Sequence, residues 1–152
     1  MLMKTKLLLL LVLGALNAHA GFSKLEAISM IETGDHDMAV GKAGEVSRYQ
    51  LMPKTWRHYT TARAYTNPAF AQQVARQHLS VLEASFRARA GRDATDFELY
   101  VVWNAGLNYY AKMGFDANRV HHSIRERAER YVNLRQINDQ PHASMLAFSV
   151  VR

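Results

Sequence analysis

Residues 28–56 read ISMIETGDHDMAVGKAGEVSRYQLMPKTW, and the interpretation of the whole chain starts from this stretch. Leu25, Ile28 and Ile31 recur at helical spacing, and Gly34 ends this run of apolar residues. Ser23 is an N-cap type residue, and Glu26 follows three positions later, which is the capping-box pattern. The sequence therefore predicts a helix over residues 24–33, followed directly by a polar, glycine-rich segment.

Glu32 lies in the last turn of this predicted helix. It follows Ile28 by four positions, so it shares the face that we expect to be buried. Burial disfavours the charged carboxylate, and so does the negative end of the helix dipole. Both effects raise the pKa towards the range that a general acid needs at neutral pH. The alternative interpretation is a half-exposed glutamate at a frayed helix end.

The rest of the chain predicts a mainly α fold. Pro53 begins a short helix, Asn67-Pro68 begins the longest one over residues 69–90, and Gly91 ends it. Two more capping boxes open later helices, at Thr95 with Glu98 and at Ser123 with Glu126. Residues 35–49 lose the helical pattern and are expected to form turns or a short hairpin, and residues 145–151 a short strand or packed coil.

Residues 1–20 have the pattern of a secretory signal peptide. Lys4 and Lys6 precede an apolar run over residues 7–16, and Asn17-Ala18-His19-Ala20 supplies small residues for cleavage. A retained membrane anchor is the alternative, but ten apolar residues are too few to span a bilayer of ~30 Å. We therefore expect an exported, periplasmic or secreted protein without a stable membrane anchor, whose single domain covers residues 21–152.

Composition excludes several classes of site. The chain has no cysteine, so disulfides, thiol catalysis, cysteine metal sites and a lipid anchor are excluded. His36 and His121-His122 lack further ligands at metal spacing, so neither a metal nor another cofactor is expected. The net charge of +6 suits a polyanionic partner. Because the arginines are spread along the chain and the protein is expected to be exported, we favour cell wall over nucleic acid, and a monomer.

Three blocks of residues resemble those of a known family, in the same order. Glu32-Thr33-Gly34 is followed by Gly44 and by Gln50-Leu51-Met52-Pro53-Lys54-Thr55. Farther along the chain stand Trp103-Asn104-Ala105-Gly106 and Glu129-Arg130-Tyr131-Val132. These blocks resemble the soluble lytic transglycosylase domain of the lysozyme-like superfamily, and they span most of the chain after the leader. The resemblance implies a lysozyme-like α domain with a turn-rich or hairpin insert after its first helix.

The resemblance also implies an activity and roles for named residues. The family cleaves the bond between N-acetylmuramic acid and N-acetylglucosamine in peptidoglycan glycan strands, giving 1,6-anhydro products. Glu32 matches its single essential glutamate, and Gln50 matches a residue that lines the cleft. Asn104 matches an asparagine that braces the cleft floor, and Tyr131 matches a tyrosine whose hydroxyl lies near the glutamate. All four are expected at the site.

The chain departs from the family pattern at Ser47-Arg48-Tyr49, where Gly-Leu-Met is usual. This change alters the part of the cleft near the scissile bond. We therefore treat Ser47 and Tyr49 as candidate substrate-binding residues, Tyr49 through stacking on a sugar ring. Ordinary packing is the alternative for that tyrosine.

Glu45 is a second candidate catalytic residue, because it lies in the turn-rich insert and can reach back towards Glu32. A second carboxylate that activates water would make the enzyme a hydrolase of peptidoglycan or chitin. Glu45 can equally hold Arg48 or a substrate hydroxyl, or face solvent. A third possibility, from another class of function, is a non-catalytic wall-binding assembly factor that keeps the cleft without turnover.

Overall fold

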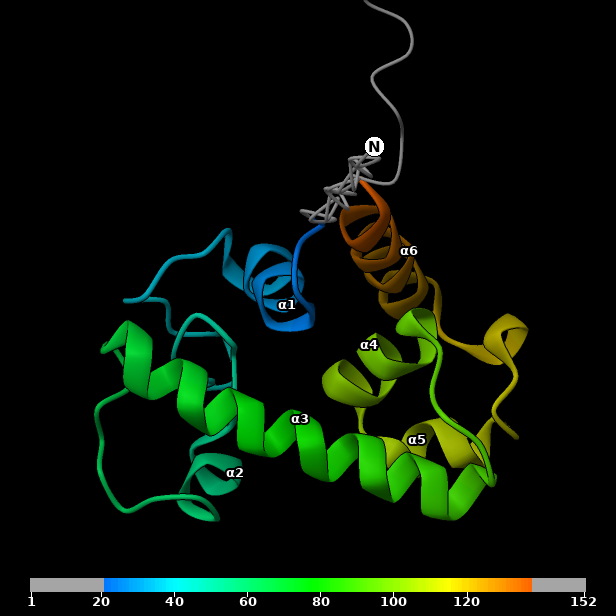
Figure 1. The fold of residues 1–152 in the computed structure, drawn as a ribbon, viewed down its shortest axis with the longest axis horizontal. Coiled ribbons are helices and arrows are strands. Elements are labelled where there is room, and N and C mark those ends of the chain that lie inside the picture. Colours follow the sequence, from blue (N-terminus) through cyan, green and yellow to red (C-terminus); the bar gives the residue numbers. More distant parts are fainter. Residues whose placement is uncertain (1–20, 138–152) are drawn as a thin grey trace, which may run out of the picture.

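The computed structural model describes residues 21–137, which form a mainly helical domain without strands among them (Figure 1). The helices are α1 (Lys24–Thr33), α2 (Pro53–Arg57), α3 (Pro68–Ala90), α4 (Asp96–Ala105), α5 (Leu107–Lys112), the 3-10 turn η1 (Ala117–Arg119) and α6 (His122–Gln136). The expected leader and the expected strand or coil at 145–151 lie outside the described residues. Across residues 21–137, no helix has the length and apolar character needed to cross a membrane.

Two of the three predicted capping boxes are confirmed. At the start of α1, the Glu26 N–H donates to Ser23 Oγ at 3.3 Å, and the Ser23 N–H donates to the Glu26 carboxylate at 2.8 Å. The Thr95 and Glu98 pair at the start of α4 makes the same reciprocal bonds. Each box satisfies N–H groups that the first helical turn leaves without a partner, so these two helices start where the sequence predicts.

The third predicted capping box is wrong. Helix α6 begins at His122 and its N-cap is His121, two residues before the predicted N-cap Ser123. Ser123 lies inside the first turn, where its hydroxyl pairs with the ring Nδ1 of His121 at 2.9 Å instead of capping the backbone. Helix α5 was not predicted either: Gly106, with φ of 86°, ends α4 and the new helix begins immediately.

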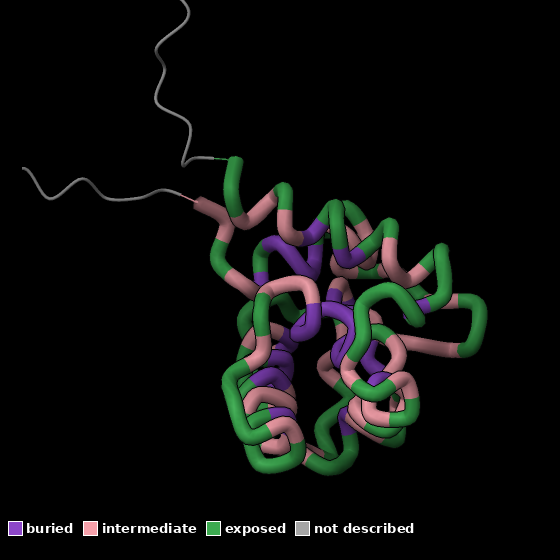
Figure 2. The backbone as a smooth tube through the Cα atoms, turned by 90° about the vertical axis from the view of Figure 1, so that its right-hand side faces the viewer, coloured by how far each residue is buried: buried purple, intermediate pink, exposed green. Residues whose placement is uncertain are grey.

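Helix α4 is the centre of the hydrophobic core. Every residue of the stretch Leu99–Trp103 is buried, and the helix packs against α6, α5 and α3. In Figure 1 the long helix α3 runs along one side of the domain, and α4 lies between it and α6. Buried residues lie on the sides of the helices that face the interior of the domain, whereas exposed residues lie on their outer sides (Figure 2). A helix that is apolar around its circumference is stable only when neighbours cover it on all sides.

The segment between α1 and α2 is a series of turns rather than a hairpin. It holds only two isolated bridges, Val40 with Val46 and Val46 with Leu51. The expected turn-rich insert is therefore confirmed in its position, in a form less regular than a pair of strands.

Arg48 ties this insert to the end of α1. Its guanidinium donates to Asp35 and Asp37, both at 2.6 Å, and its carbonyl accepts a bond from Thr33 Oγ1 at 3.1 Å. Asp35 also accepts a bond from Ser29 Oγ, inside α1, at 2.7 Å. These bonds hold the insert in a fixed position against the helix turn that carries Glu32.

Candidate active site

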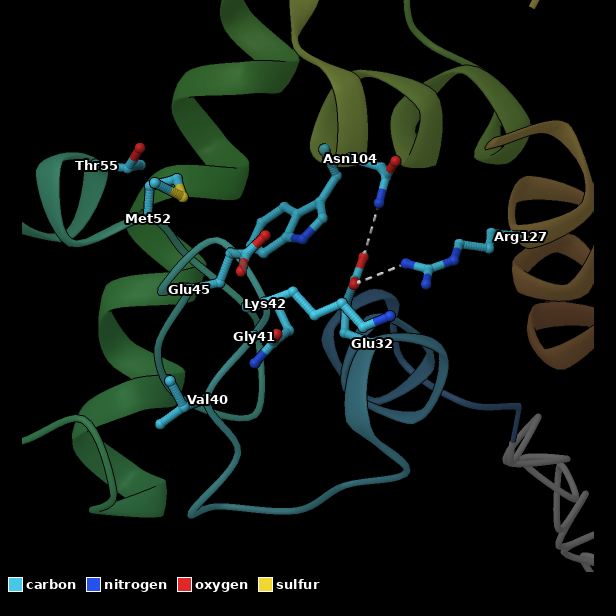
Figure 3. Close-up of a pocket in the computed structure, with 11 residues that line it drawn as sticks. Glu32, Val40, Gly41, Lys42, Glu45, Met52, Thr55, Asn104 and Arg127 are labelled. Carbon is cyan, nitrogen blue, oxygen red and sulfur yellow. Dashed lines mark hydrogen bonds and ion pairs between the residues drawn. The ribbon is translucent and has the colours of Figure 1, made fainter. Parts of the chain in front are cut away.

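Helices α4 and α6 place polar groups around the Glu32 carboxylate of α1 (Figure 3). The side chain is only 5% exposed. The Tyr100 hydroxyl donates to Oε1 at 2.8 Å, and the Asn104 amide lies 3.5 Å from the same oxygen. An Arg127 guanidinium nitrogen lies 3.4 Å from Oε2. The carboxylate at the end of α1 thus faces two residues of α4 and one of α6.

The pKa of Glu32 is raised above its ordinary value, mainly because burial disfavours the carboxylate. The Tyr100 hydrogen bond, the Arg127 charge and the Asn104 amide all lower it, and the charge of Glu45 raises it. The net direction is the one that the sequence predicts from burial and from the helix end. The group is therefore suited to stay protonated at a pH where an ordinary glutamate has ionised.

A cleft of about 530 Å³ opens beside this carboxylate. Its walls come from α1, the insert, α2, α4 and α6, and Figure 3 shows most of the lining side chains. The lining residues are Glu32, Val40, Gly41, Lys42, Glu45, Gln50, Met52, Thr55, Trp103, Asn104 and Arg127. The structure thus brings Glu32, Glu45, Gln50 and Asn104 together, four of the residues that the sequence selects.

Glu45 and Gln50 meet over Gly41 on the insert side of the cleft. The Ala43 N–H donates to the Glu45 carboxylate at 2.9 Å. A Cβ added at Gly41 would overlap the side-chain oxygens of both Glu45 and Gln50. The ends of the Glu45 and Gln50 side chains therefore occupy the space that a side chain at position 41 would fill.

Ser47 and Tyr49 do not line the cleft, and this differs from the expected substrate-binding role. Both are buried, and they build the tight turn that precedes Gln50. Ser47 and Gln50 have φ of 64° and 49°, and the Gln50 amide donates back to the Ser47 carbonyl at 3.1 Å. Positive φ at a residue other than glycine costs on the order of 1 kcal/mol. The turn therefore fixes Gln50 at the cleft, while its neighbours serve as packing.

Tyr131 is buried behind the site and is not a neighbour of the carboxylate. Its ring stacks on that of Tyr100, with centroids 5.4 Å apart. Its hydroxyl has no hydrogen-bond partner among residues 21–137. The hydroxyl bonded to Glu32 belongs to Tyr100. The position expected for the Tyr131 hydroxyl is therefore occupied by that of Tyr100, and Tyr131 packs behind it.

Sequence reasoning missed Tyr100 and Arg127. Tyr100 precedes Asn104 by four positions, so the two lie on one face of α4, and this spacing was a usable signal. Arg127 reaches Glu32 across 95 positions of sequence, and nothing in its local pattern distinguishes it from the other arginines of α6.

Trp103 forms the aromatic part of the cleft wall and is held from behind by a histidine. The ring of His78 meets it edge to face, with centroids 5.1 Å apart. His78 Nδ1 shares a hydrogen bond of 2.9 Å with the Tyr59 hydroxyl. Burial, helped by the charge of His58, lowers the pKa of His78 to about 4. The histidine is therefore a neutral packing group near neutral pH.

Within residues 21–137, no cluster of three or more histidine, aspartate or glutamate side chains is arranged to hold a metal ion. The chain matches no protein-family model, no curated protein and no solved structure.

Proposed function

We propose that this chain is an exported, monomeric, lysozyme-like enzyme that cleaves peptidoglycan glycan strands as a lytic transglycosylase. The main support is the environment of Glu32, a buried carboxyl group with a raised pKa that opens onto a cleft. The resemblance of the motifs around Glu32, Gln50 and Asn104 to that family adds the substrate class.

The first step uses Glu32 as a general acid. Its proton passes to the glycosidic oxygen between N-acetylmuramic acid and N-acetylglucosamine as that bond breaks. Positive charge develops at the anomeric carbon, and Glu32 becomes a carboxylate beside it. The Tyr100 hydroxyl, 2.8 Å away, and the Asn104 amide then stabilise the new anion.

The second step closes a ring within the sugar. The Glu32 carboxylate removes the proton of the sugar's C6 hydroxyl, and that oxygen bonds to the anomeric carbon to give a 1,6-anhydro product. Because the hydroxyl is tethered to the reacting sugar, its effective concentration is high and it needs no separate base. Glu32 ends the cycle protonated.

Hydrolysis is a second candidate, and one observation favours it: Glu45 lines the same cleft as Glu32. As a base, Glu45 would remove a proton from water, which would then attack the anomeric carbon. However, its carboxylate already accepts the Ala43 N–H and lies against Gly41, so it also serves the insert. We therefore favour the mechanism in which Glu32 acts alone.

Mass analysis of products from purified sacculi in heavy-oxygen water tests this proposal. We expect products lighter than hydrolysis products by one water and without label. The Glu45→Gln variant should be slower than wild type but faster than Glu32→Gln, with the same product. Labelled reducing ends that disappear in Glu45→Gln would establish hydrolysis instead. Sacculi that are bound without any product would favour the wall-binding assembly factor.

A further inference from the structure

Arg127 is the charged group among the three polar neighbours of Glu32, and the carboxylate holds it loosely. Its nitrogen lies 3.4 Å from the carboxylate, whereas a charge-assisted bond is about 2.7–2.9 Å long. The Arg127 side chain is 48% exposed, so water screens the pair. Little free energy therefore holds this guanidinium to Glu32, and Figure 3 shows it reaching from α6 towards the carboxylate.

The charges of the cleft make Arg127 available to another anion. When Glu32 carries its proton, the remaining charged groups of the lining are Lys42, Arg127 and Glu45. Two cations then stand against one carboxylate, and Glu45 accepts its bond from the Ala43 backbone on the insert side. The cleft in its acid form thus has an excess of positive charge, and the guanidinium has no strong partner in it.

We propose that Arg127 is a specificity-determining residue that binds a carboxylate of the glycan beside the scissile bond. This inference rests on the proposed function. The planar guanidinium can bind a carboxylate through two parallel bonds, a geometry that it does not have with Glu32 in the free cleft. A neutral glycan such as chitin offers no group of this kind.

Binding of that carboxylate also acts on Glu32. Arg127 leaves the catalytic group, so the cation that lowers its pKa is withdrawn, and a substrate anion takes its place nearby. Tyr100 and Asn104 of α4 keep their contacts, and Lys42 and Glu45 face the cleft from the insert. A strand that carries the carboxylate thereby favours the protonated form of Glu32, whereas a neutral glycan leaves Arg127 beside Glu32.

Two sources supply such a carboxylate in peptidoglycan. In strands stripped of peptide, it is the lactyl group of the muramic sugar. In strands with peptides, that group is an amide and the carboxylates belong to the peptide. Both offer the same chemistry to a guanidinium, so the test includes both kinds of strand, each with its carboxyl groups free or converted to amides.

The deciding experiment measures binding in the Glu32→Gln background, which needs no turnover and leaves Arg127 without its anionic neighbour. We expect carboxylate strands to bind about tenfold tighter than amidated ones, as for a hydrogen-bonded charge pair. Adding Arg127→Gln should abolish this preference, and Arg127→Lys should restore part of it. Arg130→Gln is the matched control, because Arg130 lies on the same helix and lines a separate groove between α1 and α6.

Equal binding of free and amidated strands, or a preference that survives Arg127→Gln, would overturn the inference. A pH profile separates recognition from mere structural support. With Glu32 intact, the basic limb of kcat should lie at higher pH on carboxylate strands than on amidated ones, because kcat reports the enzyme–substrate complex. Arg127→Gln should reduce this difference between the two kinds of strand. Turnover without carboxylate preference would reject this inference and leave the proposed function standing. Carboxylate preference without turnover would reject the proposed function and leave the binding role of Arg127 standing.

Discussion

Two glutamates of this domain have similarly little side-chain exposure, yet their pKa values shift in opposite directions. The Glu32 side chain is 5% exposed and that of Glu98 is 7% exposed. Each has an arginine and a tyrosine as neighbours. The pKa of Glu32 is raised by burial, while that of Glu98 is lowered because its partners outweigh the effect of burial.

The geometry of the partners contributes to the difference, together with a stronger effect of burial at Glu32. Glu98 receives two bonds from Arg92, at 2.7 and 2.6 Å, and two from Thr95, at 2.9 and 3.0 Å. Glu32 has one short bond, from Tyr100, and two contacts of 3.4 Å or more. Glu98 also lies in the first turn of α4, where the helix dipole favours an anion, and Glu32 lies in the last turn of α1.

The protein therefore stabilises the charged form of Glu98 and disfavours the charged form of Glu32. Burial sets the cost of the charge, and the number and length of the hydrogen bonds decide whether that cost is offset. The following predictions test the contrast, starting with the largest effect.

Glu32→Gln should lower turnover by ~10²-fold or more, because the amide can neither donate nor accept the proton that moves in the reaction. Its melting temperature should stay at or above that of wild type, since a disfavoured buried charge is removed. Rates on sacculi and thermal melts of the same preparation measure both. A folded variant with near wild-type turnover would reject Glu32 as the acid.

Glu98→Gln should show the opposite profile. Losing the charge and the two-bond pair with Arg92 should destabilise the fold by about 1–3 kcal/mol, although glutamine can still accept the Thr95 N–H of the capping box. Below the melting transition, turnover should remain within about twofold of wild type, because Glu98 does not line the cleft in the described residues. Denaturant unfolding gives the stability. A large loss of turnover in fully folded protein would contradict this division of roles.

The two variants should also differ in how stability depends on pH. Glu32 has a folded pKa above its unfolded value near 4.5, so its contribution is greatest below that pH and is lost as pH rises. Glu98 has a folded pKa below that value, so its contribution is present above pH 4.5 and is lost as pH falls.

Relative to wild type, Glu32→Gln should therefore gain stability as pH rises above about 4.5, while the deficit of Glu98→Gln should shrink as pH falls below about 4.5. Unfolding free energies of the three proteins at several pH values give the two slopes. Slopes of the same sign would show that one of the two environments is wrongly assigned.

The smallest expected effects concern the tyrosines. Tyr100→Phe removes the short bond to Glu32 and should slow turnover by roughly 2- to 10-fold. Tyr110→Phe removes a hydroxyl that lies 3.1 Å from the Phe115 carbonyl and 3.3 Å from Glu98, and it should cost ~0.5–1.5 kcal/mol of stability at unchanged turnover. Tyr131→Phe is the control, because its hydroxyl has no partner among the described residues, and it should change neither quantity much.

The sequence predicted the parts of the fold that local chemistry decides. Ser23 with Glu26 and Thr95 with Glu98 satisfy helix ends by themselves, so their pattern located α1 and α4. The same pattern failed at Ser123, because its hydroxyl pairs with the ring of His121 and the helix starts two residues earlier.

The site was predicted where its residues belong to one local segment, and missed where it depends on packing. Glu32 was found because helix end and apolar spacing are visible in its own neighbourhood. Tyr131 was given the role of Tyr100 because only tertiary packing shows which of two stacked rings faces the carboxylate. Arg127 depends on the contact between α6 and α1, which no short window of sequence contains.

Gly41 has a consequence for how this cleft can evolve or be engineered. Its missing side chain leaves room for the ends of Glu45 and Gln50, so the three positions share one volume. Alanine at position 41 would displace two flexible side-chain ends rather than backbone, altering the cleft more than the fold. Substitutions at 41, 45 and 50 should therefore be epistatic, and a combinatorial library over these three positions should reach activities that single changes miss.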